Sequence, residues 1–157
     1  MTFLTWIHVL AAVTWIGGML FLSLVIVPVL RCPQVAPHRA MLFPLVARQF
    51  RLVGWVAMAT LVMTGPVLAM SRGIDLGAPS TWPSIFYTKL IVVGLLVALS
   101  LVHDAVLGPR ASIIARKPEP DRTPSERQFL RLAPLFGRLS LMLALIVLYC
   151  AVSLART

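Results

Sequence analysis

The sequence predicts an all-α integral membrane protein: a four-transmembrane-helix bundle with both termini outside and two basic cytoplasmic loops. Of its 157 residues, 59% are hydrophobic and only 12% are charged, whereas a soluble domain carries about 25% charged residues. The mean hydropathy is +0.93. The apolar residues form four runs, and a span needs about 20 such residues. The predicted spans, within one transmembrane domain of residues 1–157, are 3–30, 52–70, 85–107 and 135–154.

The first span is predicted to be a retained helix rather than a secretory signal. A signal peptide has a basic segment before a short apolar core of roughly 7–15 residues. No Lys or Arg precedes this run, and the run continues well beyond that length. We therefore expect residues 3–30 to stay in the membrane.

The basic residues indicate the topology. The net charge is +9, and eleven of the fourteen Lys and Arg fall between spans one and two, or between spans three and four and in the adjoining turn of span four. Those eleven are Arg31, Arg39, Arg48, Arg51, Arg110, Arg116, Lys117, Arg122, Arg127, Arg131 and Arg138; the other three are Arg72, Lys89 and Arg156. Because basic loops stay in the cytoplasm, we predict that both termini face the periplasm or exterior.

The same charges indicate what the loops contact. Their partners are expected to be anionic lipid headgroups at the cytoplasmic face rather than nucleic acid. The sequence leaves open a homo-oligomer or a partner membrane subunit.

Local patterns add three elements to this plan. Residues 41–50 are amphipathic and are expected to lie at the inner interface before span two. Thr123-Pro124-Ser125-Glu126 has the residues of a capping box, with Thr at the N-cap and Glu three positions later. The helix that begins there is expected to kink at Pro134. No internal repeat is apparent.

Four ionisable residues lie within the predicted spans, where such groups are costly and usually functional. They are His8, Lys89, His103 and Asp104. At a rise of 1.5 Å per residue, His8 and Lys89 lie about 8 and 6 Å inside the outer boundary, and His103 lies about 27 Å from it. His8 and Lys89 can therefore share a site, whereas His8 and His103 of one chain cannot ligate the same iron.

Helical spacing suggests an outward-opening pocket that contains His8, Trp15 and Lys89. Met70, near the outer end of span two, could close this pocket, and Met63 lies about two turns deeper. Thioethers together with an imidazole suit Cu(I). The metal ligands predicted on this basis are His8, Met70 and Met63.

Simpler interpretations remain open for each of these residues. Lys89 could extend to the outer headgroups, and His8 could form only an interhelical hydrogen bond. His103 and Asp104, with Arg110, could be a polar cluster at the inner boundary. The methionines could be ordinary apolar filling.

Three segments resemble the copper-resistance D (CopD) family of bacterial inner-membrane proteins. They are W-x-H-V-L-A-A-x-x-W-x-G-G in the first span, R-Q-F-R-L-x-G-W…L-V-M-T-G over residues 48–65, and Y-T-K-L-I-V-V-G…H-D…P-R over residues 87–110. The resemblance implies a four-helix unit involved in copper binding, transport or tolerance, and it marks His8, Trp15, Lys89 and Pro109-Arg110.

The same segments also resemble HemJ-type protoporphyrinogen oxidases, four-helix membrane proteins that bind haem b. The histidine, tryptophan and lysine that recur there match His8, Trp15 and Lys89. The chain departs from that pattern at residues 22–31, where LSLVIVPVLR stands in place of a Pro-Arg and a further histidine. This resemblance implies haem b as the alternative cofactor and, if the chain is an enzyme, a haem-dependent oxidoreductase. A non-catalytic scaffold or accessory subunit is the third hypothesis.

Overall fold

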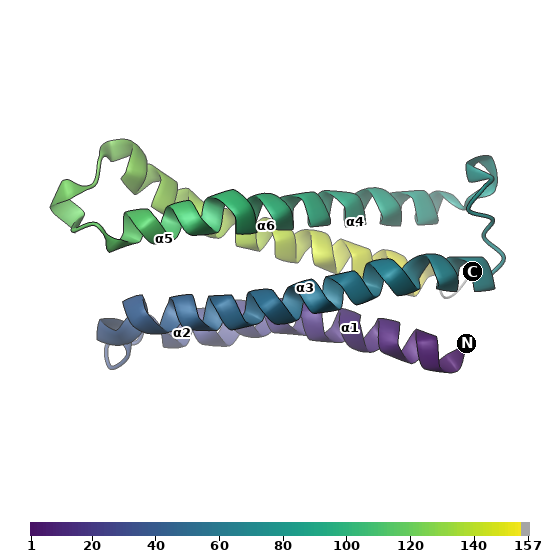
Figure 1. Cartoon of the computed structure of the whole chain (residues 1–157), viewed down its shortest axis with the longest axis horizontal. Coiled ribbons are helices and arrows are strands. Elements are labelled where there is room, and N and C mark those ends of the chain that lie inside the picture. Colours follow the sequence, from purple (N-terminus) through teal and green to yellow (C-terminus); the bar gives the residue numbers. More distant parts are fainter. Residues whose placement is uncertain (155–157) are drawn as a thin grey trace. The chain divides into compact units, whose positions relative to one another are not determined.

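The computed structural model describes residues 1–154, apart from the side chain of residue 40. Within that range the chain is helical without strands, and four helices are long and apolar enough to span a membrane (Figure 1). They cover Thr2–Val29, Met41–Ser71, Ser84–Arg116 and Pro124–Leu154. This confirms an all-α chain with four candidate transmembrane helices. The second and fourth helices begin well before the predicted starts at 52 and 135.

The chain divides into two compact units, Met1–Trp82 and the segment that begins at Pro83. Each unit is a helical hairpin whose two long helices pack along each other, α1 with α3 in the first unit and α4 with α6 in the second (Figure 1). We call them the first and the second hairpin. The single domain over residues 1–157 stays a prediction.

The first hairpin begins with a long helix in three parts. α1 runs through one π-helical turn into the short α2, and a 3-10 turn then leads into α3. The bounds are α1 Thr2–Phe21, the π turn Leu22–Ile26, α2 Val27–Val29, the 3-10 turn Ala36–His38 and α3 Arg39–Ser71. α3 ends at Ser71, and two residues later Gly73 has a φ of 81°, a conformation that glycine adopts without strain. The Ile74 N–H bonds to the Ala69 carbonyl there, as in a Schellman cap.

The second hairpin has the same order of parts. α4 passes through a π turn into α5, and after a short connection α6 returns along α4 and α5. The bounds are a 3-10 turn Pro79–Thr81 before the hairpin, α4 Ser84–Val102, the π turn His103–Leu107, α5 Gly108–Arg116, the 3-10 turn Glu119–Asp121 and α6 Pro124–Leu154.

Both π turns end two residues before a proline. The Val27 N–H reaches back five residues to the Leu22 carbonyl, just before Pro28. The Gly108 N–H does the same to the His103 carbonyl, just before Pro109. A proline ring clashes with the carbonyl four residues earlier, and the wider turn moves that carbonyl away. The sequence did not reveal this parallel between the hairpins. Two isolated prolines do not form a recognisable repeat, and the π turns before them are visible only in the backbone.

Three prolines lie inside long helices without ending them. α3 continues through Pro44 and Pro66, so residues 41–50 are part of α3 and not a separate interfacial helix. α6 likewise continues through Pro134. Each proline removes one backbone hydrogen bond, and membrane helices tolerate this because neighbouring groups compensate for it.

The predicted capping box at the start of α6 is confirmed. The Glu126 carboxylate accepts a hydrogen bond from the Thr123 N–H at 2.9 Å. In return, the Thr123 hydroxyl accepts one from the Glu126 N–H at 3.3 Å. Lys117 adds an ion pair to the same carboxylate at 2.6 Å, so the start of α6 is tied to the end of α5.

Candidate functional site

Glycines bring α1 and α3 close together in the first hairpin. Three glycines each face a large side chain of the other helix, so the two backbones can approach. The pairs are Gly18 with Phe50, Gly54 with Trp15 and Gly65 with His8. A Cβ on Gly54 would lie 3.6 Å from the Trp15 ring, and one on Gly65 would lie 3.7 Å from Cε1 of His8. The His8 ring therefore packs against α3 at Gly65, where the glycine leaves just enough room for it.

His8 forms a short hydrogen bond with Thr64, the residue before Gly65. Its Nδ1 lies 2.7 Å from the Thr64 hydroxyl oxygen. That hydroxyl donates its single hydrogen to the Thr60 carbonyl at 2.6 Å, because a carbonyl can only accept. Thr64 must therefore accept from His8, so the proton of the neutral imidazole is on Nδ1. The nitrogen that carries the lone pair is Nε2.

This arrangement is typical of a histidine that binds a metal. Such a histidine nearly always donates its second ring N–H to an acceptor, which fixes the tautomer and the ring orientation. In the first hairpin the acceptor is a buried hydroxyl, which itself belongs to a regular helix. The sequence did not predict Thr64, because an uncharged hydroxyl is less conspicuous in an apolar span than an ionisable group. The polar pair Thr64-Gly65 within an apolar span is the signal that could have found it.

Trp15 lies on the same face of α1 as His8, two turns further along, and is 9% exposed. Its ring packs on Gly54 of α3. The observed contact explains a large aromatic residue at this position as part of the helix interface. Its predicted contact with a cofactor stays a prediction.

Met63 and Met70 point away from the His8–Thr64 contact. At about 100° per residue, each is turned by roughly 100–120° from Thr64 around α3. Their exposed fractions are 75% and 62%. They are also seven residues apart, about 10.5 Å along the helix. The first hairpin therefore does not bring either thioether to His8 on the same helix face.

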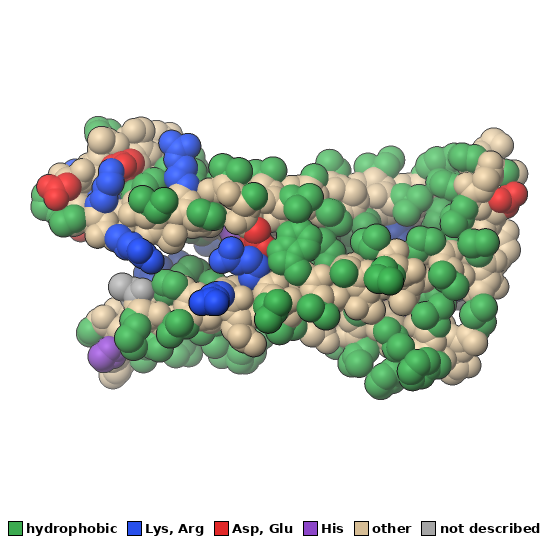
Figure 2. Space-filling view, viewed as in Figure 1, with side chains coloured by type: hydrophobic (Ala, Val, Ile, Leu, Met, Phe, Trp, Pro, Cys, Tyr) green, Lys and Arg blue, Asp and Glu red, His purple; other side chains and the backbone are tan. Residues whose placement is uncertain are grey.

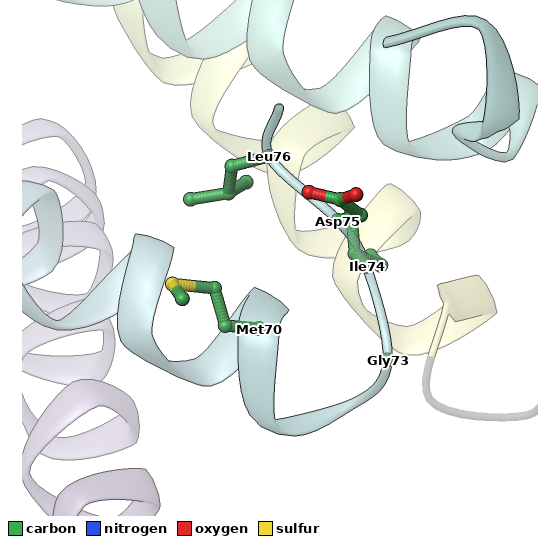
Figure 3. Close-up of a pocket in the computed structure, with 5 residues that line it drawn as sticks. All are labelled: Met70, Gly73, Ile74, Asp75 and Leu76. Carbon is green, nitrogen blue, oxygen red and sulfur yellow. The ribbon is translucent and has the colours of Figure 1, made fainter. Parts of the chain in front are cut away.

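Met70 instead lines an open pocket at the end of α3, together with Gly73, Ile74, Asp75 and Leu76 (Figure 3). Figure 3 shows the thioether of Met70 and the side chain of Leu76 on the same side of this loop. The Asp75 carboxylate accepts a hydrogen bond from the Gly77 N–H at 2.8 Å, and this contact stabilises the loop after α3.

The other intramembrane ionisable residues belong to the second hairpin. Lys89 is half-buried on α4. Its predicted site with His8 would require residues of both hairpins, and that pairing stays a prediction.

His103 Nδ1 lies 3.1 Å from an oxygen of Asp104, in the π turn. Arg110 lies over the Phe129 ring, 5.3 Å from its centre. The His103–Asp104 pair of the predicted inner cluster is thus present, and Arg110 has an aromatic contact.

Within the described residues, no three or more His, Cys, Asp or Glu side chains are grouped so that they could hold a metal ion. A metal centre built from such groups alone is therefore not formed in that part of the chain. A centre that needs only one protein nitrogen is compatible with His8.

The chain resembles a protein of the bacterium Aquifex aeolicus (strain VF5). The two are 40% identical over 107 residues, which make up 67% of this chain and 68% of the Aquifex protein. The two proteins belong to one family. The description of the Aquifex member is "Uncharacterized protein", so membership of this family brings no activity with it. No protein-family model matches the chain, and no solved structure matches it.

Proposed function

We propose that the protein is a membrane-embedded haem b protein with a redox role, in which Nε2 of His8 is the axial ligand of the iron. The observation that supports this is the Thr64 hydroxyl, which accepts the Nδ1 proton of His8 at 2.7 Å. A haem iron can be held by one histidine. Such a group would need few protein ligands, so it does not require the cluster of three or more His, Cys, Asp or Glu that the described residues lack.

The residues around His8 fit the chemistry of this group. His8 lies on an apolar helix beside a buried contact of α1 with α3, where the flat, largely apolar porphyrin would avoid water. When bound, haem supplies one-electron redox chemistry. This chain contributes the axial nitrogen, and Thr64 orients it. By resemblance, Lys89 is proposed to attract the porphyrin carboxylates, and Trp15 to contact the cofactor.

Copper is the second candidate, because Nε2 of His8 is equally suitable for Cu(I). It ranks below haem since Met63 and Met70 lie on another face of α3 and are largely exposed. Copper binding at His8 therefore requires a second ligand from the second hairpin or from another subunit. In that case the protein would take part in copper binding, transport or tolerance.

The proposed setting is the bacterial inner membrane, with both termini outside. The basis is the distribution of charge. Eleven of the fourteen Lys and Arg lie in the α2–α3 connection, the first half of α3, α5, the α5–α6 connection and the first half of α6. Figure 2 shows apolar side chains along most of the visible helix surface, and Lys and Arg gathered near α5 in the second hairpin. His8 then lies in the outer part of the bilayer, so a redox partner would approach from outside.

The test is optical. The full chain is expressed with ample haem, purified in detergent and compared with His8→Ala and Thr64→Val; His103→Ala is the matched control, because it removes the other intramembrane imidazole. We expect a Soret band in the wild type and in the control, and none in His8→Ala. Loss of a group that orients a metal ligand typically weakens binding 10- to 100-fold, and we expect a loss of that size in Thr64→Val.

Other results would change the assignment. A Soret band of unchanged intensity in His8→Ala would refute the axial role of His8. Bound copper without a Soret band, lost in His8→Ala, would replace haem by copper. If neither ligand binds and His8→Asn keeps full stability, the protein is a scaffold in which His8 only bridges two helices.

A further inference from the structure

The first two turns of α6 form an open pocket at the basic end of the second hairpin. Pro124, Arg127, Gln128 and Arg131 line it, and its volume is about 510 Å³. This is many times the roughly 30 Å³ that one water molecule occupies in the liquid, so a phosphate group with its substituents fits. The polar contacts offered by the lining are two guanidinium groups and an amide.

Arg127 and Arg131 are four residues apart, and Arg138 follows after seven more. At about 100° per residue, these three side chains fall within about 40° of one another on one stripe of α6. Like charges at this spacing destabilise a helix. Within the part of the chain that the structure describes, neither Arg127 nor Arg131 has an ion-pair partner. An anion from outside the chain would remove this repulsion.

The surrounding loop holds Arg127 in place. Its Nε donates to the Arg122 carbonyl at 3.1 Å. The Arg122 guanidinium in turn donates to the carbonyls of Lys117 and Ala115, each at 3.0 Å. The nearby Glu126 is engaged by Lys117 at 2.6 Å, so it does not neutralise the pocket. A cation fixed in this way loses little side-chain freedom when it binds.

The length of α6 sets the level of this pocket in the membrane. Its 31 residues extend about 46 Å, whereas the hydrocarbon core is only about 30 Å thick. If the apolar part begins at 135, Arg131 lies about 6 Å and Arg127 about 12 Å outside the hydrocarbon. The headgroup layer on each side is about 5–8 Å thick. The Arg131 end of the pocket therefore lies in the layer where lipid phosphates lie, and the Arg127 end lies just beyond the outer edge of that layer.

From these observations we infer that the Arg127–Arg131 pocket binds the phosphate of an anionic phospholipid. Guanidinium groups recognise phosphate by paired N–H donors. The stripe continues to Arg138, which lies about 4–5 Å inside this boundary and would extend its guanidinium back toward the headgroups. This inference does not depend on His8 or on any cofactor.

The experiment measures lipid binding to the delipidated full chain by native mass spectrometry, with phosphatidylglycerol as the probe and phosphatidylcholine as the neutral comparison. The test variant is Arg127→Gln/Arg131→Gln. The matched control is Arg31→Gln/Arg39→Gln, which removes the same charge from the other basic loop. We expect phosphatidylglycerol to bind about 10- to 30-fold more weakly to the test variant, and to bind the control with unchanged affinity.

Further arms make the result decisive. Arg127→Lys/Arg131→Lys keeps the charge without the paired donors and should retain only part of the affinity. Equal losses in the test variant and in the control would mean a diffuse basic surface and would overturn the proposed pocket, as would no loss at all. Inorganic phosphate that occupies the pocket equally well, and displaces the lipid, would show that the ligand is a soluble phosphate compound instead. Circular dichroism of each variant checks that the helices are retained.

Discussion

Gly17 and Gly18 are adjacent on α1, and only one of them touches the partner helix. A Cβ on Gly18 would overlap the Phe50 ring of α3, whereas a Cβ on Gly17 would have nothing within 4 Å. The substitutions Gly18→Ala and Gly17→Ala therefore add the same methyl group to neighbouring positions. We expect opposite effects on the free energy of unfolding.

The magnitudes follow from two opposing terms. Alanine is better than glycine inside a helix by about 1 kcal/mol, and this gain applies to both variants. Overpacking typically costs 1–3 kcal/mol, and this cost applies only to Gly18→Ala, because the Phe50 ring must move. Gly17→Ala should therefore be neutral or more stable than the wild type by up to about 1 kcal/mol. Gly18→Ala should be less stable than Gly17→Ala by about 1–3 kcal/mol.

The assay is unfolding of the purified protein in mixed micelles of increasing dodecyl sulfate content, followed by circular dichroism. The double variant Gly18→Ala/Phe50→Ala tests the cause, since removal of the ring should remove the penalty of the added methyl group. If Gly18→Ala is as stable as Gly17→Ala, the close contact of α1 with α3 at this level is wrong. The packing of His8, a residue of α1, against α3 would then lose its support.

Two further predictions concern the basic loop and the topology. Thr123→Ala removes the N-cap hydroxyl of α6 and should lower the free energy of unfolding by about 0.5–2 kcal/mol, measured in the same micelles. Thr123→Ser keeps a hydroxyl and should retain most of the wild-type stability. An unchanged free energy of unfolding in Thr123→Ala would contradict the capping box. Alkaline phosphatase fused to the C-terminus should be active, whereas a fusion within residues 117–122 should be inactive, and the reverse pattern would invert the proposed orientation.

Sequence alone predicted the coarse fold because hydrocarbon imposes a simple rule. Backbone groups in lipid must be paired within the segment, so a run of apolar residues implies a helix. The capping box at Thr123 was also predictable, since it depends on residue types at a fixed local spacing.

The helix ends were less predictable, because hydropathy detects the apolar part of a helix and not its extension into the headgroups. Residues 41–51 and 124–134 are polar enough to fall outside the predicted spans, yet they continue α3 and α6. Their prolines suggested breaks. A single missing hydrogen bond did not outweigh the rest of each helix.

The candidate site was predicted in part. His8 was found because a histidine is conspicuous in an apolar span, and its depth followed from the helix rise. Its partner Thr64 lies 56 positions away and is uncharged, so no local pattern connects the two residues. The direction of Met63 and Met70 depends on which face of α3 meets α1, and that face is set by where the glycines of α3 lie.

The π turns before Pro28 and Pro109 have a consequence for how sequences of this family can vary. A π turn holds one more residue than an α-helical turn, so it acts as a one-residue insertion absorbed within the helix. Every side chain beyond it is rotated by about 100° relative to the uninterrupted helix. A relative that lacks one residue of this turn, and has another residue in place of the proline, would form a regular helix there. His8 and Lys89 would not move, and α2 or α5 beyond the turn would present the same face. Relatives that are one residue shorter at 22–26 or 103–107 should therefore keep the same faces.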